Sequence, residues 1–224
     1  MTCTARTLAA GAALALGLAV APAAATAADA PPDPTPEQIA QIERYYESGA
    51  WKRDADRVTA RALKYLRGAV RRARDPRKLV AVFDIDDTAL LTYDCMKAGD
   101  FTDSRRSLCV VTGPHTPIAG TLKLYRWAQS RRVTIAFVTG RPELVRRVTV
   151  DQLTRAGFRG RYDLRLRPDA DRRESVVPFK SSARKALQRG GRRVVLSIGD
   201  QRSDLAGGFA QRTFKLPNTM YGLP

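Results

Sequence analysis

Short apolar runs alternate with helix-like patterns from residue 79 onward, and this alternation limits the possible folds more than any other feature of the chain. The runs at 79–85, 133–138, 162–166 and 194–198 have the length of buried strands. Strands that alternate with helical segments are typical of βαβ units, which build a parallel sheet. We therefore expect an α/β fold in which helices flank a parallel sheet.

Two helices are expected before the first strand. Thr35 starts a capping-box pattern, which predicts a helix that begins there and ends near residues 48–49. A second apolar stripe predicts a helix over 54–74. Later in the chain, Pro117 and Pro142 are each expected to be the first residue of a helix, because proline is well tolerated at that position.

The N-terminus has the pattern of a secretory signal peptide. A positive residue, Arg6, precedes an apolar run over 8–20, and small residues follow at 25–28. We expect residues 1–27 to be removed by cleavage near Ala27, so that the mature protein is exported. The alternative is a retained membrane anchor, which the short, alanine-rich run disfavours.

The rest of the chain is expected to hold one folded domain. Residues 28–34 form a proline-rich linker, and the length of 35–224 suits a single domain with a substantial core. Removal of the signal removes Cys3 and leaves Cys95 and Cys109 as the one possible intramolecular pair. Outside the cytosol such a pair is expected to oxidise to a disulfide.

The segment 88–116 departs from the alternation of strands and helices. It separates the first predicted strand from its crossover helix and contains Cys95, Cys109 and His115. A connection this long within a compact domain is usually functional. We therefore expect a small cap over a site at the end of the first strand. His115, the single histidine, is expected to have a structural or solvent-exposed role.

Polar residues gather where the predicted strands end and where one later helix begins. Ligands of an open parallel sheet bind outside the carboxyl ends of its strands. The residues that reach this edge from four separate segments are Asp84, Asp86, Thr139, Gly140, Lys180, Asp200 and Asp204. Each is common after a strand, but their joint occurrence in this order is highly specific.

Each of these residue types has a role in phosphoryl transfer. Asp84 is expected to attack phosphorus and to form an acyl phosphate. Asp86 is expected to protonate the leaving oxygen and then to activate water as a general base. Thr139, the backbone N–H groups near Gly140 and the ammonium of Lys180 are expected to hold phosphate oxygens.

The acidic residues also predict a divalent cation. Asp84, Asp200 and Asp204 would repel a dianionic substrate unless a cation intervened, and Mg²⁺ suits a few carboxylates combined with phosphate and water. Neighbouring aspartates are expected to raise the pKa of Asp86, whereas Mg²⁺ and Lys180 lower it. A reaction that needs protonated Asp86 is expected to be faster in mild acid.

These motifs resemble those of the haloacid dehalogenase (HAD) superfamily. The segment 84–88 matches the first motif of that superfamily, Thr139 the second, Lys180 the third, and the segment 199–204 the fourth. The segments 199–205 and 215–221 further resemble the subfamily IIIB acid phosphatases, the group that includes class B acid phosphatases and plant vegetative storage proteins.

The resemblance covers residues 36–224 and is strongest from Lys78 onward. It implies a Rossmann-like core, a Mg²⁺ cofactor, and the main-chain carbonyl of Asp86 as a metal ligand beside the carboxylates. Arg202 stands where relatives often carry an aromatic residue. This departure bears on the fine substrate preference and not on the chemistry.

The net charge of +17 leaves other interpretations open. Arginine is spread over nearly every segment, which favours a solvated basic surface over a specific nucleic-acid site. An exported, Mg²⁺-dependent acid phosphatase that acts on small phosphomonoesters is the first hypothesis. A non-catalytic storage protein on the same fold and a polyanion-binding protein are the alternatives. The presence of Asp84 and Asp86 argues against the storage protein.

Overall fold

The computed structural model describes residues 1–2, 33–113 and 115–222 of the chain. Apart from its first two residues, the predicted signal peptide lies outside the described residues, as does most of the predicted linker. From Asp33 onward the chain forms a single unit. In that described part, no helix combines the length and the apolar character needed to cross a bilayer.

The elements of this unit alternate as the sequence predicts. Its helices are α1 (Pro36–Glu47), α2 (Ala50–Arg71), α3 (Tyr93–Lys97), α4 (Asp103–Thr112), α5 (Ala119–Ser130), α6 (Arg146–Arg155) and α7 (Val177–Leu187). Its strands are β1 (Leu79–Phe83), β2 (Leu90–Leu91), β3 (Thr116–Pro117), β4 (Thr134–Pro142), β5 (Asp163–Arg167), β6 (Arg193–Gly199) and β7 (Arg212–Lys215). Short 3-10 turns lie at Pro76–Lys78, Glu143–Val145, Arg189–Gly191 and Arg202–Asp204.

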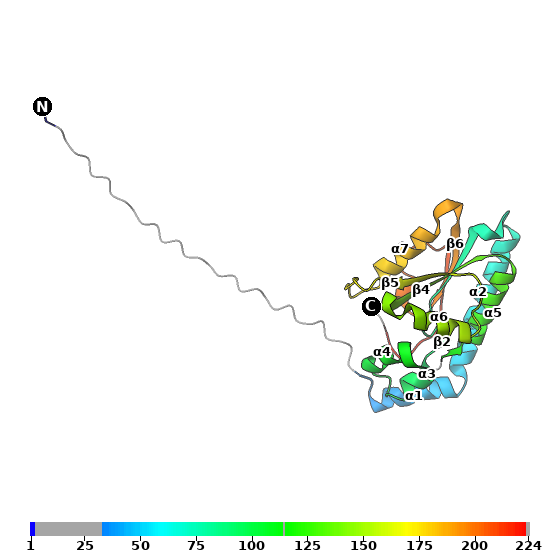
Figure 1. Cartoon of the computed structure of the whole chain (residues 1–224). Coiled ribbons are helices and arrows are strands. Elements are labelled where there is room, and N and C mark those ends of the chain that lie inside the picture. The colour runs from blue at the N-terminus through cyan, green and yellow to red at the C-terminus, as the bar shows by residue number, and fades with distance from the viewer. Residues whose placement is uncertain (3–32, 114, 223–224) are drawn as a thin grey trace. The chain divides into compact units, whose positions relative to one another are not determined.

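A parallel sheet in the order β5-β4-β1-β6-β7 forms the centre of the unit (Figure 1). β1 lies in the middle, and Phe83 at its end is paired with Phe137 of β4 and Ile198 of β6. The sheet confirms the expected α/β fold. Because all five strands run in one direction, their carboxyl ends meet at one edge of the sheet, and this edge carries the site.

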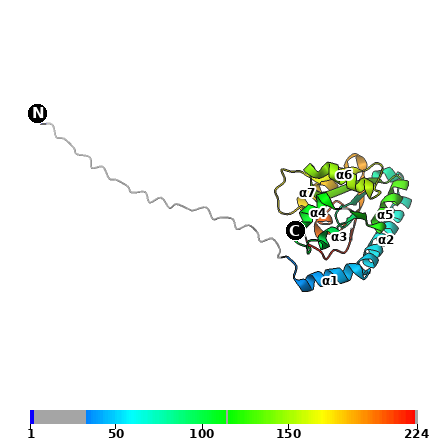
Figure 2. The same cartoon turned by 60° about the horizontal axis from the view of Figure 1, so that its bottom comes forward.

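Alternate residues of the central strands enter two separate cores. In β1, Leu79, Ala81 and Phe83 pack on the face that α2 and α5 cover, and those two helices lie side by side in both views (Figures 1 and 2). Val80 and Val82 point to the opposite face, which α7 covers. Full burial of each larger aliphatic side chain contributes about 1.5–3 kcal/mol, so the two faces hold the strand ends in register.

Several predicted boundaries differ from the observed ones. The second helix begins at Ala50, four residues before the predicted start, because Gly49 turns the chain with a φ of 73° directly after the first helix. Pro117 belongs to β3 and not to a helix, and Pro142 ends β4. Sequence patterns also did not predict β7, in which Phe214 alone is buried.

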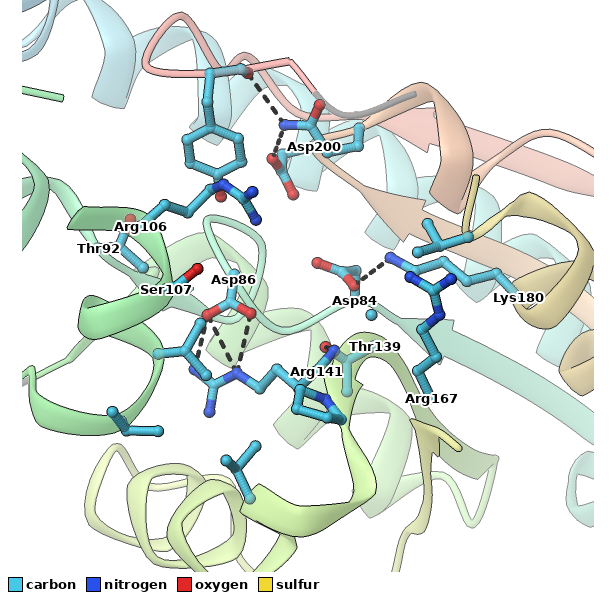
Figure 3. Close-up of a pocket in the computed structure, with 18 of the residues that line it drawn as sticks. Asp84, Asp86, Thr92, Arg106, Ser107, Thr139, Arg141, Arg167, Lys180 and Asp200 are labelled. Carbon is cyan, nitrogen blue, oxygen red and sulfur yellow. Dashed lines mark hydrogen bonds and ion pairs between the residues drawn. The ribbon is translucent and has the colours of Figure 1, made fainter. Parts of the chain in front are cut away.

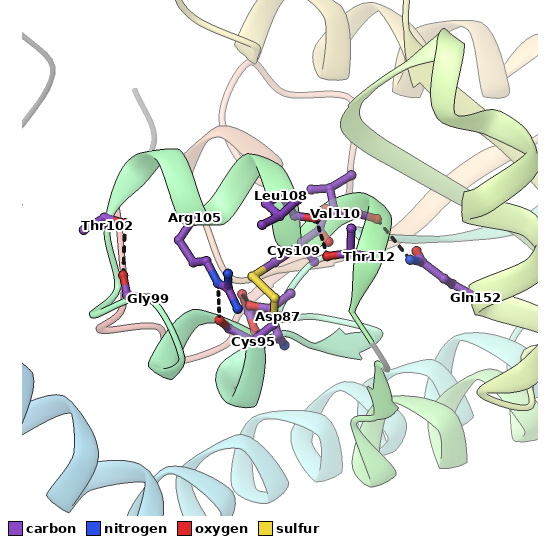
Figure 4. The surroundings of a disulfide bond; sticks show 12 residues. Asp87, Cys95, Gly99, Thr102, Arg105, Leu108, Cys109, Val110, Thr112 and Gln152 are labelled. Atoms are coloured by element: carbon purple, nitrogen blue, oxygen red, sulfur yellow. Dashed lines mark hydrogen bonds between the residues drawn. A yellow bond between two sulfur atoms is a disulfide. The ribbon is translucent and has the colours of Figure 1, made fainter.

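The predicted cap segment folds into two short strands and two helices. Strands β2 and β3 pair antiparallel at its base, and α3 and α4 lie beyond them. Cys95 of α3 and Cys109 of α4 form the expected disulfide (Figure 4). Tyr93 of α3 stacks on Tyr46 of α1 with ring centroids 4.5 Å apart, so α1 packs directly against the cap.

Candidate active site

Asp84 stands at the carboxyl end of the central strand. Its backbone N–H donates to the carbonyl of Ile198 at 3.0 Å, which extends the pairing of β1 with β6 by one residue. Its carboxylate is 6% exposed, and Oδ1 accepts a hydrogen bond from Lys180 Nζ at 2.9 Å. The other oxygen points away from Lys180 in Figure 3 and has no hydrogen-bond partner among the described residues.

A tight turn after β1 directs Asp86 away from the sheet. Asp87 adopts a φ of 51°, and its N–H donates to the carbonyl of Leu90 at 2.7 Å. The N–H of Leu90 in turn donates to the carbonyl of Ile85 at 2.9 Å. This closed turn holds Asp86 on the other side of the pocket from Lys180, with its side chain 20% exposed (Figure 3).

Three carboxylates form one acidic cluster at the strand ends. Asp84, Asp200 and Asp204 each have an oxygen within 4.8 Å of the other two, and all three are buried. Gly199 allows this approach, since a Cβ at that position would lie 2.2 Å from the Cβ of Asp204. The N–H of Gln201 donates to Asp204 Oδ2 at 2.8 Å and holds the turn closed.

The cluster carries more negative charge than the protein neutralises. Burial and the charge of Asp204 raise the pKa of Asp84 well above its ordinary value, and only Lys180 opposes them. Burial and Asp204 likewise raise the pKa of Asp200 to about 6. Three buried carboxylates that disfavour one another's ionised form suit a divalent cation, and oxygen donors suit Mg²⁺.

Lys180 is the cation that joins the acidic cluster to α7. It lies in the first turn of that helix, and its ammonium donates to both Asp84 and Asp204. Burial would lower its pKa, but the two carboxylates raise it, so the side chain stays charged. Arg184, one turn later, donates to the carbonyl of Asp204 at 2.7 Å and fixes the loop that carries that aspartate.

Asp86 pairs with Arg141, a partner that the sequence analysis missed. Arg141 Nη2 donates to Asp86 Oδ1 at 2.7 Å, and Nε donates to Oδ2 at 2.9 Å. Burial would raise the pKa of Asp86, yet the charge and hydrogen bonds of Arg141 hold it below its ordinary value. The sequence left the balance between aspartates and cations at Asp86 open, and the structure adds a guanidinium that lowers the pKa.

Arg141 is itself fixed by a hydrogen-bond network that reaches the cap. It is 3% exposed, and its Nη1 donates to Thr149 Oγ1 at 3.1 Å and to Gln152 Oε1 at 2.6 Å. The amide nitrogen of Gln152 donates at 3.0 Å to the carbonyl of Val110 in α4 (Figure 4). One chain of polar contacts thus connects Asp86 to the cap.

Thr139 and Gly140 lie on the same pocket as Asp84, Asp86 and Lys180. Thr139 is 1% exposed, and its Oγ1 accepts a hydrogen bond from the N–H of Arg141 at 3.2 Å. The structure therefore brings all the predicted acidic and phosphate-binding residues to one edge. Asp204 does not line the pocket and stands behind Lys180.

The segment after β7 also reaches the site. The sequence analysis named this segment only for its resemblance to subfamily IIIB and assigned it no contact. Asn218 Nδ2 donates to Asp200 Oδ2 at 2.8 Å, and Thr88 Oγ1 donates to Oδ1 at 3.0 Å. The hydroxyl of Tyr221 donates to Asp87 Oδ2 at 2.5 Å. These contacts orient Asp200, which lines the pocket, and Asp87, which lies beside it.

His115 does not line the pocket. Both of its ring nitrogens are buried and have no hydrogen-bond partner in the part of the chain that the structure describes. Burial lowers the pKa of its imidazole, so it is mainly neutral near pH 7. The expectation that His115 has a structural or solvent role stays a prediction.

Comparison with known proteins decides the family. A family model described as HAD superfamily, subfamily IIIB (acid phosphatase), matches residues 4–224. The chain belongs to this family. As a subfamily IIIB member it is a phosphatase, that is, a phosphoric monoester hydrolase, and the resemblance seen in its motifs is confirmed.

Relatives of this subfamily IIIB phosphatase include both enzymes and storage proteins. It is 35% identical over 193 residues to acid phosphatase 1 of Solanum lycopersicum, which covers 83% of this chain and 75% of the relative. It is 32% identical over 183 residues to vegetative storage protein 2 of Arabidopsis thaliana, covering 79% and 68% respectively. The class C acid phosphatase from Bacillus anthracis shares the fold, with a TM-score of 0.66 at 18% identity over 83% of this chain and 85% of that one.

Proposed function

We propose that this phosphatase hydrolyses phosphate monoesters through a phospho-aspartyl intermediate on Asp84. The observation that carries the proposal is the placement of Asp84 between two different partners. Lys180 contacts one of its oxygens, the other oxygen is open to the pocket, and Asp86 stands across the pocket on its own support. A nucleophile and a proton donor on opposite sides of a phosphoryl group are what a two-step transfer needs.

In the first step the open oxygen of Asp84 attacks phosphorus, and the bond from phosphorus to the leaving oxygen breaks. Protonated Asp86 gives its proton to that oxygen, so the product leaves as an alcohol. Thr139, the N–H groups near Gly140 and Lys180 hold the other phosphoryl oxygens while their charge increases. The products of this step are the alcohol and an acyl phosphate on Asp84.

In the second step water replaces the alcohol. Asp86, now ionised, accepts a proton from water as the water oxygen attacks phosphorus. The bond between phosphorus and Asp84 breaks, the carboxylate is regenerated, and inorganic phosphate leaves. Because Arg141 lowers the pKa of Asp86, its ionised form suits this step, and its acid form requires acidic solution.

The acidic cluster is proposed to hold Mg²⁺. The carboxylates of Asp84 and Asp200, supported by Asp204, and the main-chain carbonyl of Asp86 would bind it. When bound, the cation would offset the negative charge of the cluster and allow a dianionic ester to approach. The raised pKa values of Asp84 and Asp200 support a cation at this place.

We further propose that the protein is exported after removal of residues 1–27. The disulfide between Cys95 and Cys109 supports an oxidising compartment. A similar protein, 32% identical over 195 residues, is named as a glycoprotein, the stem 28 kDa glycoprotein of Glycine max. N-terminal sequencing of secreted material would test both the cleavage near Ala27 and the export.

One assay tests the proposed reaction. Purified mature protein is offered a panel of phosphomonoesters across pH, with and without a chelator, and Mg²⁺ is then added back. We expect turnover that is faster in mild acid, is lost on chelation and returns with Mg²⁺. Turnover that survives exhaustive chelation would contradict the proposed metal requirement. An absence of turnover on every ester would favour the storage or polyanion-binding alternatives.

A further inference from the structure

Arg167 is the arginine of the pocket whose charge the protein compensates least. Three arginines, Arg106, Arg141 and Arg167, line this pocket. Arg106 is held by Asp103 at 2.6 Å, and Arg141 by Asp86 at 2.7 Å.

The acidic partner of Arg167 is shared with another residue. Arg167 reaches Asp171 only at 3.5 Å, whereas Arg173 donates to both oxygens of Asp171, at 2.8 and 2.7 Å. Asp171 is therefore mainly neutralised by Arg173. The charge of Arg167 is left without a close counter-ion of its own among the described residues.

Some N–H groups of the Arg167 guanidinium have no acceptor among the described residues. Its Nη2 donates to Asp171 and to the carbonyl of Arg173, which fixes one side of the group. Its Nε is buried and has no partner in the described part of the chain, and no described residue accepts from Nη1. An oriented guanidinium with unused N–H groups is suited to an oxyanion acceptor.

The register of the sheet places Arg167 farther out than the nucleophile. Asp84 follows Phe83, which is level with Phe137 and Leu164 in the neighbouring strands, so Asp84 is level with Arg165. Arg167 is two residues beyond that level, about 6–7 Å along the strand. The backbone of Arg167 therefore lies beyond the level of the nucleophile, and its side chain enters the pocket from the end of β5, on the same side as Lys180 (Figure 3).

We propose, on the basis of the proposed function, that Arg167 binds a second oxyanion of the substrate, a carboxylate or a second phosphate on the leaving group. Val110, Val145 and Val176 also line this pocket and lower its polarity, which favours ion pairing within it. Glu174 lines the pocket too but is exposed, so solvent screens its charge and it weakens an anion's binding without preventing it.

Three phosphate esters with three-carbon leaving groups test this subsite. Glycerol phosphate has no second anion, phosphoglycerate carries a carboxylate, and glycerol bisphosphate carries a second phosphate. We expect kcat/KM to be about tenfold higher for at least one of the anionic esters, because the guanidinium makes a charge-assisted hydrogen bond to the second anion. The ester that is preferred identifies the anion.

Variants then assign the preference to Arg167. Arg167→Gln is expected to remove it, so that the loss on the preferred ester exceeds the loss on glycerol phosphate by about tenfold. Arg167→Lys keeps the charge and is expected to keep part of the preference for the anionic ester. A partial preference in this variant shows that the loss in Arg167→Gln does not come from poor folding. Arg172→Gln removes an exposed charge from the same loop outside the pocket and serves as the matched control. Glu174→Gln is expected to strengthen the preference.

The outcomes separate this inference from the proposed function. Equal losses of Arg167→Gln on all three esters would place Arg167 on the transferred phosphoryl group and overturn the inference. A wild-type protein that cleaves all three esters without preference would also overturn it while leaving the proposed function intact. Failure to cleave any ester would instead contradict the proposed function.

Discussion

Lys180, Asp200 and Asp204 are each at most 3% exposed, whereas Val111 in the cap helix α4, which faces the same pocket, is 40% exposed. These three residues and Asp84 form the sheet-edge group, which the ends of β1 and β6 and the start of α7 hold in place. The cap adds its own side chains, such as Met96 and Phe101, to the main core, but the part of it that faces the pocket is exposed. Chemistry that tolerates little displacement thus lies on the buried edge, and the wall that contacts the variable part of a substrate lies on the more exposed segment.

The largest effect is expected inside the sheet-edge group, at Asp84. Asp84→Asn keeps the shape of the side chain but cannot attack phosphorus, so we expect kcat to fall by about 10⁴-fold or more while the protein still folds. Steady-state kinetics and a thermal melt measure the two properties. Asp151→Asn on the exposed face of α6 is the matched control. A well-folded Asp84→Asn protein with near-normal turnover would rule out Asp84 as the nucleophile.

A more selective effect is expected at Asp86, which lies between the two regions. Asp86→Asn cannot supply a proton, so its loss on alkyl phosphates should exceed its loss on an activated aryl phosphate by about 100-fold. Because water activation also suffers, the phospho-enzyme should accumulate with the aryl ester, which acid quenching and mass spectrometry would detect. Equal losses on both ester types, with no trapped phosphate, would count against a role of Asp86 in proton transfer.

A smaller effect is expected at Arg141, which connects Asp86 to the cap. Arg141→Gln removes the charge that lowers the pKa of Asp86, so that pKa should rise. The acid form of Asp86 then persists to higher pH, and the falling limb of the kcat–pH profile should move upward, with a loss of about tenfold in kcat from poorer orientation. Arg147→Gln, an exposed neighbour on α6, is the control. A lowered kcat with an unmoved profile would limit Arg141 to a structural role.

The smallest effect on turnover is expected in the cap itself. Replacing Cys95 and Cys109 by serine opens a loop with a sequence separation of 14 and should lower the free energy of unfolding by about 3 kcal/mol. Because the sheet-edge group does not depend on this bond, kcat should change by no more than a few-fold. Urea unfolding and kinetics on the same samples compare the two regions directly. A collapse of kcat without loss of stability would mean that the cap positions the chemistry.

Much of the sheet-edge group was predictable because local patterns determine it. An apolar run that ends in Asp84 fixes a buried strand and the position of the carboxylate, and the same logic applies to Asp200. Parallel strands then bring these ends together regardless of the sequence between them. Lys180 was predictable from its place at the start of a helix beside the edge.

The partners on the outer side of the pocket were not predictable in the same way. Arg141 and Arg167 are two among 39 lysines and arginines, and no local pattern distinguishes them from solvated neighbours. Their roles depend on which carboxylates the fold places opposite them. β7 was missed for a related reason: three of its four residues are polar and exposed, since it is an edge strand with one buried face.

Asn218 and Tyr221 reach back from the segment after β7 to Asp200 and Asp87. Two carboxylates of the site are therefore oriented by residues that contribute no strand to the sheet. The sheet can assemble without these residues, but the site cannot be completed, so folding and activity are separable in this chain. A version truncated before Asn218 should lose turnover while the circular dichroism of the sheet persists.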